Sequence, residues 1–210
     1  MNVPDLHSLL LFLAAGLALN FTPGPDMLFV AARGASEGRA AGIVSALGIG
    51  AGTLVHITLV ALGLAALLSA VPVAYLVVRI GGAMYLIYLG VRALRSHASL
   101  ALERVEPAPL RVVFRQGVIT NVLNPKVALF FLAFLPQFVD PSRGNPALQV
   151  VALGLLFDIT GTLVNLGVAL GSSRAAASLR GSGRAAAVLH KVTGLLFIGL
   201  GLRLAFAGRR

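Results

Sequence analysis

Most of this chain consists of apolar runs long enough to cross a lipid bilayer, which takes about 20 residues per helix. Hydrophobic residues make up 58% of its 210 residues, and charged residues only 11%. A soluble domain carries about 25% charged residues because its surface must be hydrated. The sequence therefore predicts an all-α integral membrane protein without a soluble domain.

Six transmembrane helices are predicted, at 6–32, 42–69, 72–94, 113–138, 147–171 and 187–207. The second and third are separated by a short stretch that ends at Pro72, and a proline there favours a tight break over one continuous helix. The residues before the first span lack the basic region of a secretory signal peptide, so the first apolar run is expected to be retained.

The positive charges are interpreted as a topology signal. The net charge is +10, but the arginines form no basic face with interleaved aromatic residues, so nucleic-acid binding is not expected. Cytoplasmic loops are enriched in Lys and Arg, and the predicted loops are strongly biased, so both termini are expected to face outward. Ten arginines follow the first, third and fifth spans, and three lie on the other side: Arg33, Arg39, Arg92, Arg95, Arg104, Arg111, Arg115, Arg174, Arg180 and Arg184 against Arg143, Arg209 and Arg210.

Two repeats, 1–98 and 112–210, are predicted within a single transmembrane domain, 1–210, joined by a linker at 99–111. Their ends carry similar glycine patterns: Arg79-Ile-Gly-Gly82 and Leu89-Gly-Val-Arg92 in one, Lys191-Val-Thr-Gly194 and Leu200-Gly-Leu-Arg203 in the other. Three spans per repeat is an odd number. The two repeats are therefore predicted to lie in opposite orientations.

A proline interrupts the first helix of each repeat, in Asn20-Phe-Thr-Pro-Gly-Pro-Asp26 and in Asn121-Val-Leu-Asn-Pro-Lys126. Proline removes a backbone donor, and in lipid the freed carbonyls must be satisfied inside the protein or by water in a cavity. A structural kink is one interpretation. Inverted repeats with matched broken helices are, however, typical of secondary transporters, in which the breaks mark the substrate site. The candidate substrate-binding residues are Asn20, Thr22, Pro23, Gly24, Pro25, Asn121, Asn124, Pro125, Lys126 and Asn165.

Lys126 lies about eleven residues into its predicted span, too deep to reach the interface easily. A charged lysine at this depth costs roughly 2.5–3.5 kcal/mol on insertion scales, so it is expected to have a partner or a function. Asp26 and Asp158 are the acids inside the predicted spans. Two hypotheses follow: an ion pair between the repeats, or a substrate carboxylate that competes for Lys126 while an aspartate takes the amino group or a proton.

Small and polar residues line one face of two other spans. Five positions of the fifth span share a helical face and are predicted to point inward: Gly154, Asp158, Gly161, Thr162 and Asn165. Ser45, Gly48, Gly52 and His56 do the same in the second. Gly48-x-x-x-Gly52 is a close-packing pattern that is compatible with a homodimer.

His56 belongs to the coupling candidates together with Asp26, Lys126 and Asp158. It has two interpretations, a proton relay or a hydrogen-bonded core histidine, and the second is favoured.

Enzymatic motifs are absent from the sequence. There is no cysteine, which excludes disulfides, thiolate metal sites and thiol nucleophiles. No nucleophile elbow, phosphate loop or His-Glu-x-x-His pattern occurs, so no catalytic residue, metal or cofactor is expected. Two intramembrane aspartates could form an acid dyad, which leaves an intramembrane aspartyl protease as the enzymatic alternative.

The chain resembles the LysE/RhtB superfamily of bacterial amino-acid exporters over nearly its whole length. The resemblance is carried by Asn20-Phe-Thr-Pro-Gly-Pro-Asp26, the glycine-rich second span, Gly82-Ala-Met-Tyr-Leu-Ile-Tyr-Leu-Gly90, Phe114-Arg-Gln-Gly117, Asn124-Pro-Lys126 through Leu135-Pro-Gln-Phe138, and Lys191-Val-Thr-Gly194 with Gly199-Leu-Gly201. The pair of Pro-Gly-Pro and Asn-Pro-Lys at this spacing is the specific part. It looks closer to the threonine/homoserine branch than to the basic-amino-acid branch.

This resemblance implies export of amino acids or related zwitterions across the bacterial cytoplasmic (inner) membrane, coupled to protons. Two other classes remain as alternatives. An exporter of a metal or other ion is disfavoured because the spans lack clustered carboxylate or thiolate ligands. A membrane scaffold that transports nothing would not need broken helices around buried charges.

Overall fold

The computed structural model describes residues 5–70, 72–95 and 106–178, together with positions 191, 194, 195, 197–199, 201, 202, 205 and 206. Every regular element within these residues is helical. The predicted all-α class is therefore confirmed. Most of the sixth predicted span and the first part of the predicted linker lie outside the described residues.

The first predicted span is a pair of helices, α1 (Leu6–Phe21) and α2 (Pro25–Glu37), which meet at an angle of 47°. Asp5 caps α1 by accepting the backbone N–H of Ser8 at 3.0 Å, which satisfies one of the donors that a helix start leaves free. The expected proline break is confirmed. Helix α2 continues past residue 32 to Glu37, so the first arginine of the predicted loop, Arg33, is helical.

Helices α3 (Arg39–Ala70) and α4 (Pro72–Arg95) form the next two predicted spans. Gly38, between α2 and α3, has a φ of 90°, in the left-handed region that glycine adopts without steric cost, and the chain turns there. Helix α3 ends at Ala70 and α4 begins at Pro72, so the predicted separation at this proline is confirmed.

The fourth predicted span begins three residues earlier than expected and changes helix type along its length. It consists of α5 (Leu110–Val122), α6 (Pro125–Leu129), a π-helix η1 (Phe130–Phe134) and a 3₁₀-helix η2 (Leu135–Phe138). The bend at the second proline break is 45°. The linker therefore ends at Pro109, two residues before the predicted boundary. The second helix change coincides with Pro136, which cannot donate to a helical carbonyl.

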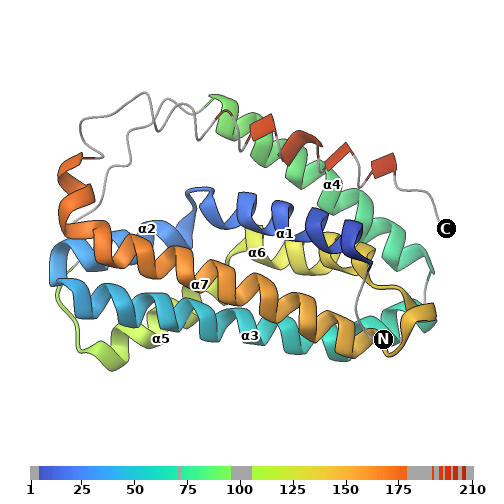
Figure 1. The fold of residues 1–210 in the computed structure, drawn as a ribbon, viewed down its shortest axis with the longest axis horizontal. Coiled ribbons are helices and arrows are strands. Elements are labelled where there is room, and N and C mark those ends of the chain that lie inside the picture. The colour runs from blue at the N-terminus through green and yellow to red at the C-terminus, as the bar shows by residue number, and fades with distance from the viewer. Residues whose placement is uncertain are drawn as a thin grey trace.

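A short 3₁₀-helix, η3 (Pro141–Arg143), leads into α7 (Pro146–Ser178), the fifth predicted span. Figure 1 shows α3, α7 and the two broken pairs running side by side along the long axis, with α4 lying obliquely at the upper edge of the view. Gly154 lies against Ile57, and Gly42 lies against Ala169. Residue numbers rise in opposite directions along this contact, so α3 and α7 are antiparallel.

Helices α3 and α5 approach each other through glycines. A Cβ on Gly52 would lie 2.8 Å from the carbonyl oxygen of Val118, and one on Gly117 would lie 2.9 Å from that of Ser45. Both distances are too short for a side chain, and small residues of this kind let membrane helices pack backbone to backbone. The glycine stripe of the second predicted span therefore packs against α5.

Helix α4 has a similar contact with the described residues of the last predicted span. A Cβ on Gly90 would lie 2.6 Å from the carbonyl oxygen of Gly194, and one on Gly201 would lie 2.8 Å from that of Ala83. The numbers again rise in opposite directions. The two glycine patterns that the sequence places at the ends of the predicted repeats thus lie against each other.

Two helical stretches of the described residues are long and apolar enough to cross a membrane, Arg39–Gly63 and Pro146–Gly171. Each bent pair passes the same test when it is taken as one span, which brings the number to four. Large apolar side chains cover the outside, and Leu62, for example, is 74% exposed. A surface of this kind is suited to lipid rather than water.

An aromatic cluster fills the centre of the bundle between α1, η1 and α7. Its buried members are Phe12, Phe130, Phe131, Phe134, Phe138, Phe157 and Phe197. The rings of Phe130 and Phe157 stack with their centroids 4.5 Å apart, and such pairs add to the energy of burial. This cluster holds the helix that follows the second proline break against α1 and α7.

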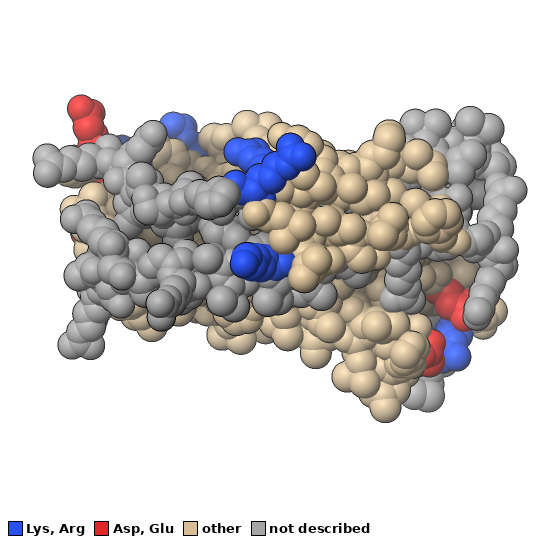
Figure 2. Space-filling view, turned by 90° about the horizontal axis from the view of Figure 1, so that it is seen from above, with Lys and Arg blue, Asp and Glu red and all other residues tan. Residues whose placement is uncertain are grey.

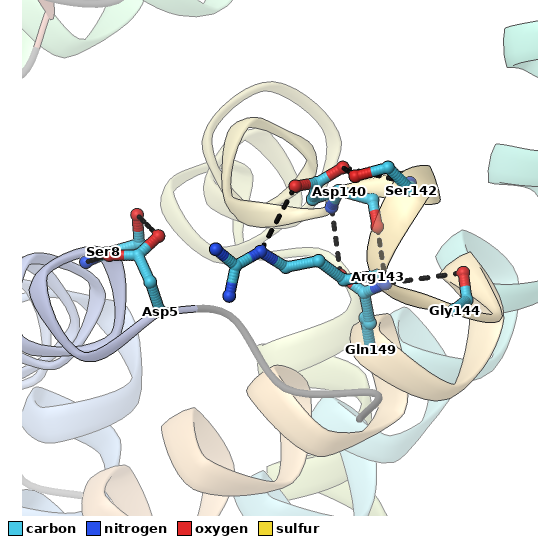
Figure 3. A network of polar contacts seen from close by, with 7 residues as sticks. All are labelled: Asp5, Ser8, Asp140, Ser142, Arg143, Gly144 and Gln149. Atoms are coloured by element: carbon cyan, nitrogen blue, oxygen red, sulfur yellow. Dashed lines mark hydrogen bonds and ion pairs between the residues drawn. The ribbon is translucent and has the colours of Figure 1, made fainter.

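The loop around η3 is tied together by polar contacts at the end of the bundle where α1 begins (Figure 3). The buried Gln149 accepts the N–H of Asp140 at 2.9 Å and donates to its carbonyl at 2.8 Å. The hydroxyl and backbone N–H of Ser142 donate to the Asp140 carboxylate and hold its pKa below the ordinary value. In the view of Figure 2, acidic side chains lie near the two ends of the long axis, and Lys and Arg side chains lie between them as well as beside the acids at one end.

Candidate functional site

The break between α1 and α2, here called break one, comprises Thr22, Pro23 and Gly24. The carbonyl of Leu19 would receive its helical hydrogen bond from residue 23, and proline has no N–H to give. It accepts the N–H of Thr22 at 3.1 Å instead. The hydroxyl of Thr22 donates to the carbonyl of Ala18 at 2.6 Å. The two prolines and Gly24 thus open the helix, and Thr22 closes part of the gap.

Lys126 reaches across from α6 and donates to break one. Its Nζ lies 3.1 Å from the carbonyl oxygen of Leu19 and 3.0 Å from that of Thr22. Gly24 makes room for it, because a Cβ there would lie 3.1 Å from the Lys126 Nζ. An ammonium group has three N–H donors, so one remains after these two bonds.

The predicted ion pair of Lys126 with an aspartate is not formed. The ion pairs within the described part of the chain are Arg33–Glu37 and Arg143–Asp140. The backbone carbonyls that the prolines free are strong hydrogen-bond acceptors. They accept the Lys126 amine, for which a carboxylate partner was expected from the sequence. Asp26 and Asp158 are left available to other groups.

The break between α5 and α6, here called break two, comprises Leu123 and Asn124. The carbonyl of Asn121 would receive its helical hydrogen bond from residue 125, which is a proline and has no N–H to give. It accepts the N–H of Asn124 at 2.9 Å and lies 3.2 Å from the Nε2 of His56. The Asn124 side chain caps α6 by accepting the N–H of Lys126 at 3.0 Å. Break two is therefore closed largely by its own residues and by His56.

Asp26 stands in the first turn of α2 and is 8% exposed. Its Oδ2 accepts the side-chain amide of Asn121 at 2.9 Å, whereas its Oδ1 is buried without a hydrogen-bond partner. A buried carboxylate oxygen without a donor is costly. The contact joins the two breaks, and the free oxygen leaves an acceptor for a ligand.

Helix α7 contributes a second carboxylate. Asp158 accepts the hydroxyl of Thr162 at 3.5 Å. Asn20, just before break one, donates to the Phe157 carbonyl at 3.3 Å and to the Thr160 hydroxyl at 3.2 Å. Asp26 and Asp158 share no hydrogen bond within the described residues, as a protease dyad would require.

These side chains surround a small cavity between the breaks, α3 and α7. Its free volume is about 20 Å³, which is room for about one water molecule. The lining residues are Asn20, Asp26, Met27, Ile49, Thr53, Asn121, Lys126, Val127, Phe157, Asp158, Gly161, Thr162 and Asn165. An amino acid does not fit into this space.

The cavity gathers eight of the residues that the sequence singled out: Asn20, Asp26, Asn121, Lys126, Asp158, Gly161, Thr162 and Asn165. The remaining candidates do not line it. Thr22, Pro23, Gly24, Pro25, Asn124 and Pro125 build the breaks, and His56 packs behind break two. Gly154, predicted to point inward with Asp158, packs against Ile57 and Phe131 instead.

The sequence reasoning missed the contribution of α3. Ile49 and Thr53 line the cavity and lie one helical turn apart, on the face next to the glycine stripe. In this helix the sequence singled out only the stripe of Ser45, Gly48, Gly52 and His56, because its residues are small or polar. Met27, Val127 and Phe157 were also missed, since apolar residues in an apolar chain carry no distinguishing signal.

A second buried polar cluster lies at the end of α2, outside the cavity. Arg33 is 4% exposed, pairs with Glu37, and donates to the Glu106 carbonyl at 2.9 Å and to Gln116 at 2.7 Å. Glu37 also accepts the N–H of Ala108 at 2.8 Å. The cluster fastens α2 to α5 and to the segment before it. The sequence placed Arg33 in a loop as a topology signal, and this placement is wrong.

A small polar cavity at the meeting point of two broken helices, inside a bundle with an apolar outer surface, is an arrangement typical of membrane carriers. The family model of the LysE type translocator matches residues 17–208. The chain therefore belongs to the LysE type translocator family, and it is a multi-pass membrane protein.

Several curated proteins are similar to the chain along most of their length. An uncharacterised membrane protein of Pseudomonas aeruginosa is 36% identical over 191 residues, 88% of each chain. An uncharacterised membrane protein of Vibrio cholerae is 30% identical over 97% of this chain and 98% of its own. A leucine efflux protein of Salmonella typhimurium is 29% identical over 92% of each chain. No solved structure matches.

Proposed function

We propose that this protein exports amino acids from the cytoplasm by alternating access. The observation that carries the proposal is the charge arrangement of the cavity. The amine of Lys126 and the carboxylates of Asp26 and Asp158 line the same small space without pairing. Charges inside a membrane are expensive unless they serve a ligand or an ion. A zwitterion supplies one charge of each sign.

The carboxylate of the substrate is assigned to Lys126. The third N–H of its ammonium group is free for a ligand, and the start of α2 has no side-chain cap at Gly24. The N-terminus of a helix favours an anion. The ammonium group of the substrate is assigned to the free Oδ1 of Asp26 and to Asp158.

The side chain of the substrate is assigned to the apolar part of the lining, Met27, Ile49, Val127 and Phe157. These residues suit a neutral, apolar side chain better than a charged one. The leucine efflux proteins among the relatives support an amino acid of this kind. The threonine/homoserine branch stays a prediction from the resemblance.

Six spans in two inverted repeats, with both termini outward, are part of the proposal. The sequence patterns align Gly82 with Gly194 and Gly90 with Gly201. The contact of Gly90 with Gly194 then has its counterpart in that of Gly201 with Ala83, beside Gly82. The breaks support the same relation between the two repeats, because the helix after each break begins with a proline followed by a charged residue, Pro25-Asp26 in α2 and Pro125-Lys126 in α6. Rocking of the two repeats would open the cavity to each side in turn.

Proton coupling is assigned to Asp158, which lines the cavity and accepts a long hydrogen bond from Thr162 at 3.5 Å. A carboxyl group that alternates between a proton and a substrate ammonium would exchange one for the other across the membrane. Export of a metal ion is less well supported, because no group of three His, Asp or Glu side chains is arranged around a common point in the described residues.

The proposal is tested by proton-driven flux of labelled amino acids in liposomes. Lys126→Ala and Asp158→Asn, at wild-type reconstitution levels, are expected to abolish this flux. Lys191→Ala and Asp140→Asn are matched controls, since both residues lie away from the cavity, and they should transport normally. Wild-type flux in both cavity variants would refute the site. A thermal-shift screen against amino acids and metals identifies the substrate class, because a ligand stabilises the folded state it binds.

A further inference from the structure

At each break, one backbone carbonyl that lies four residues before a proline lacks its helical donor, and the two carbonyls have similar partners in the structure. Leu19 precedes Pro23 by four residues, and Asn121 precedes Pro125 by four. Each carbonyl accepts a backbone N–H from three residues on, at 3.1 Å and 2.9 Å. Each then has a second neighbour from the opposite half of the chain, Lys126 Nζ at 3.1 Å or His56 Nε2 at 3.2 Å.

The surroundings of His56 fix its role in this contact. The residue is 7% exposed, and its ring stacks on Phe131 with the centroids 5.7 Å apart and the planes at 19°. A carbonyl oxygen only accepts hydrogen bonds, so Nε2 must carry the hydrogen. The histidine is buried behind break two and does not line the cavity.

Asn121 connects this contact to the substrate site. Its carbonyl faces His56, and its side-chain amide donates to Asp26 at 2.9 Å. Its Oδ1 also accepts the hydroxyl of Thr53 at 3.4 Å. The position of the Asp26 carboxylate therefore depends on the backbone that His56 holds.

We propose that His56 is a positioning residue: its Nε2–H holds break two in shape as Lys126 holds break one, so that each half of the molecule closes the break in the other. His56 positions Asn121, and through it Asp26, and does not relay protons. The inference rests on the proposed function, in which Asp26 meets the substrate. It replaces the interpretation of His56 as a proton relay.

The test uses the different reach of two amides. The side-chain nitrogen of glutamine can occupy the position of the histidine Nε2, whereas that of asparagine is one methylene shorter. His56→Gln is expected to transport within about threefold of wild type, and His56→Asn and His56→Leu to lose about five- to tenfold in maximal rate, as for one buried hydrogen bond. Glutamine cannot relay protons as histidine does, so its rescue separates positioning from proton transfer.

A second readout does not depend on transport. The chain has no cysteine, so Met27→Cys places a single thiol in the cavity lining. Its reaction with a water-soluble maleimide reports how often the cavity opens. In this background His56→Asn and His56→Leu should label faster than the parent, and His56→Gln should label at the parental rate.

The outcomes separate this inference from the proposed function. Wild-type flux and labelling in a folded His56→Leu protein would overturn the positioning role, as would a folded His56→Gln protein as defective as His56→Asn. If His56→Leu does not fold, the comparison of glutamine with asparagine decides. A wild-type protein that moves no amino acid contradicts the export function, and the labelling rates then decide the positioning role by themselves.

Discussion

The two proline breaks bend their helices by nearly the same angle, 47° and 45°, yet they differ in how their polar groups are satisfied. Break two is capped by the side chain of its own Asn124, and its free carbonyl faces the buried ring of His56. Break one ends at Gly24, which has no side chain to cap α2, and its free carbonyls depend on the amine of Lys126.

This difference indicates that the two breaks have different roles, one in the scaffold and one in ligand binding. A break held by short, buried contacts, here the Asn124 cap and His56, is rigid and serves as scaffold. A break satisfied by one long, flexible side chain can release that side chain to a ligand at little cost, because the donor is replaced rather than lost. Changes at break one should therefore affect transport directly, whereas changes to the cap of break two should mainly affect stability, and break two should affect transport only through Asn121 and Asp26.

After the two cavity variants that should abolish flux, the largest expected effect is that of Asp26→Asn beside break one. The amide oxygen can still accept from Asn121, so the fold should persist, but the charge that meets the substrate ammonium is gone. Loss of one hydrogen bond to a charged group corresponds to about a 10- to 100-fold fall in flux at low substrate concentration. Flux in liposomes and the thermal unfolding midpoint should be measured together. Normal flux would place the ammonium group elsewhere.

Gly52→Ala and Gly161→Ala compare the helix contacts behind the two breaks. A Cβ on Gly52 would lie 2.8 Å from the Val118 carbonyl oxygen, whereas one on Gly161 would lie 2.9 Å from the side-chain amide of Asn20. A backbone carbonyl can move less easily than a side-chain amide. Gly52→Ala should therefore lower the free energy of unfolding by about 1–3 kcal/mol, and Gly161→Ala should lower it by less. Unfolding midpoints in detergent measure both. Equal shifts would mean that break two is no more rigid than break one.

Asn124→Ala removes the cap of α6 at break two. Loss of an N-cap costs about 1 kcal/mol in typical cases, so the unfolding midpoint should fall modestly. Asn124 does not line the cavity, so flux per folded molecule should stay close to wild type. A protein of unchanged stability with abolished flux would reverse the assignment of scaffold and substrate site.

The smallest effect concerns pH and the loop around Asp140, away from both breaks. The pKa of this carboxyl is lowered by its Ser142 contacts, so the folded state binds fewer protons than the unfolded state. Its stabilising contribution is complete above the ordinary pKa of about 4 and is lost as the pH falls below it. Unfolding midpoints of wild type and Asp140→Asn should therefore run parallel from about pH 5 upward and converge only in acid. A pH dependence of flux above this range then originates elsewhere.

The sequence predicted the broken helices and most of the polar cavity, because proline and buried charge have consequences that do not depend on tertiary detail. Pro23, Pro25 and Pro125 remove donors in any fold, and Lys126 and Asp158 are too costly in lipid to be incidental. The predicted separation at Pro72 follows from the same property of proline.

The partners of these groups could not be predicted. Lys126 donates to carbonyls rather than to an aspartate, because the freed backbone lies within its reach, and reach is a property of the packed structure. Arg33 is buried by a segment 73 residues further along the chain, a distance that local patterns do not bridge. The apolar lining from Ile49 and Phe157 follows from helix rotation, which a uniformly apolar sequence leaves open.

The cavity between the breaks has room for about one water molecule, and this has a consequence for measured affinities. A substrate can enter only molecules that have opened, so its apparent dissociation constant equals the intrinsic one divided by the open fraction. A substitution that only raises this fraction tightens the binding of every substrate by the same factor. Selectivity among amino acids, expressed as a ratio of affinities, is unchanged by such a substitution, and changes in that ratio therefore identify the residues that contact the substrate.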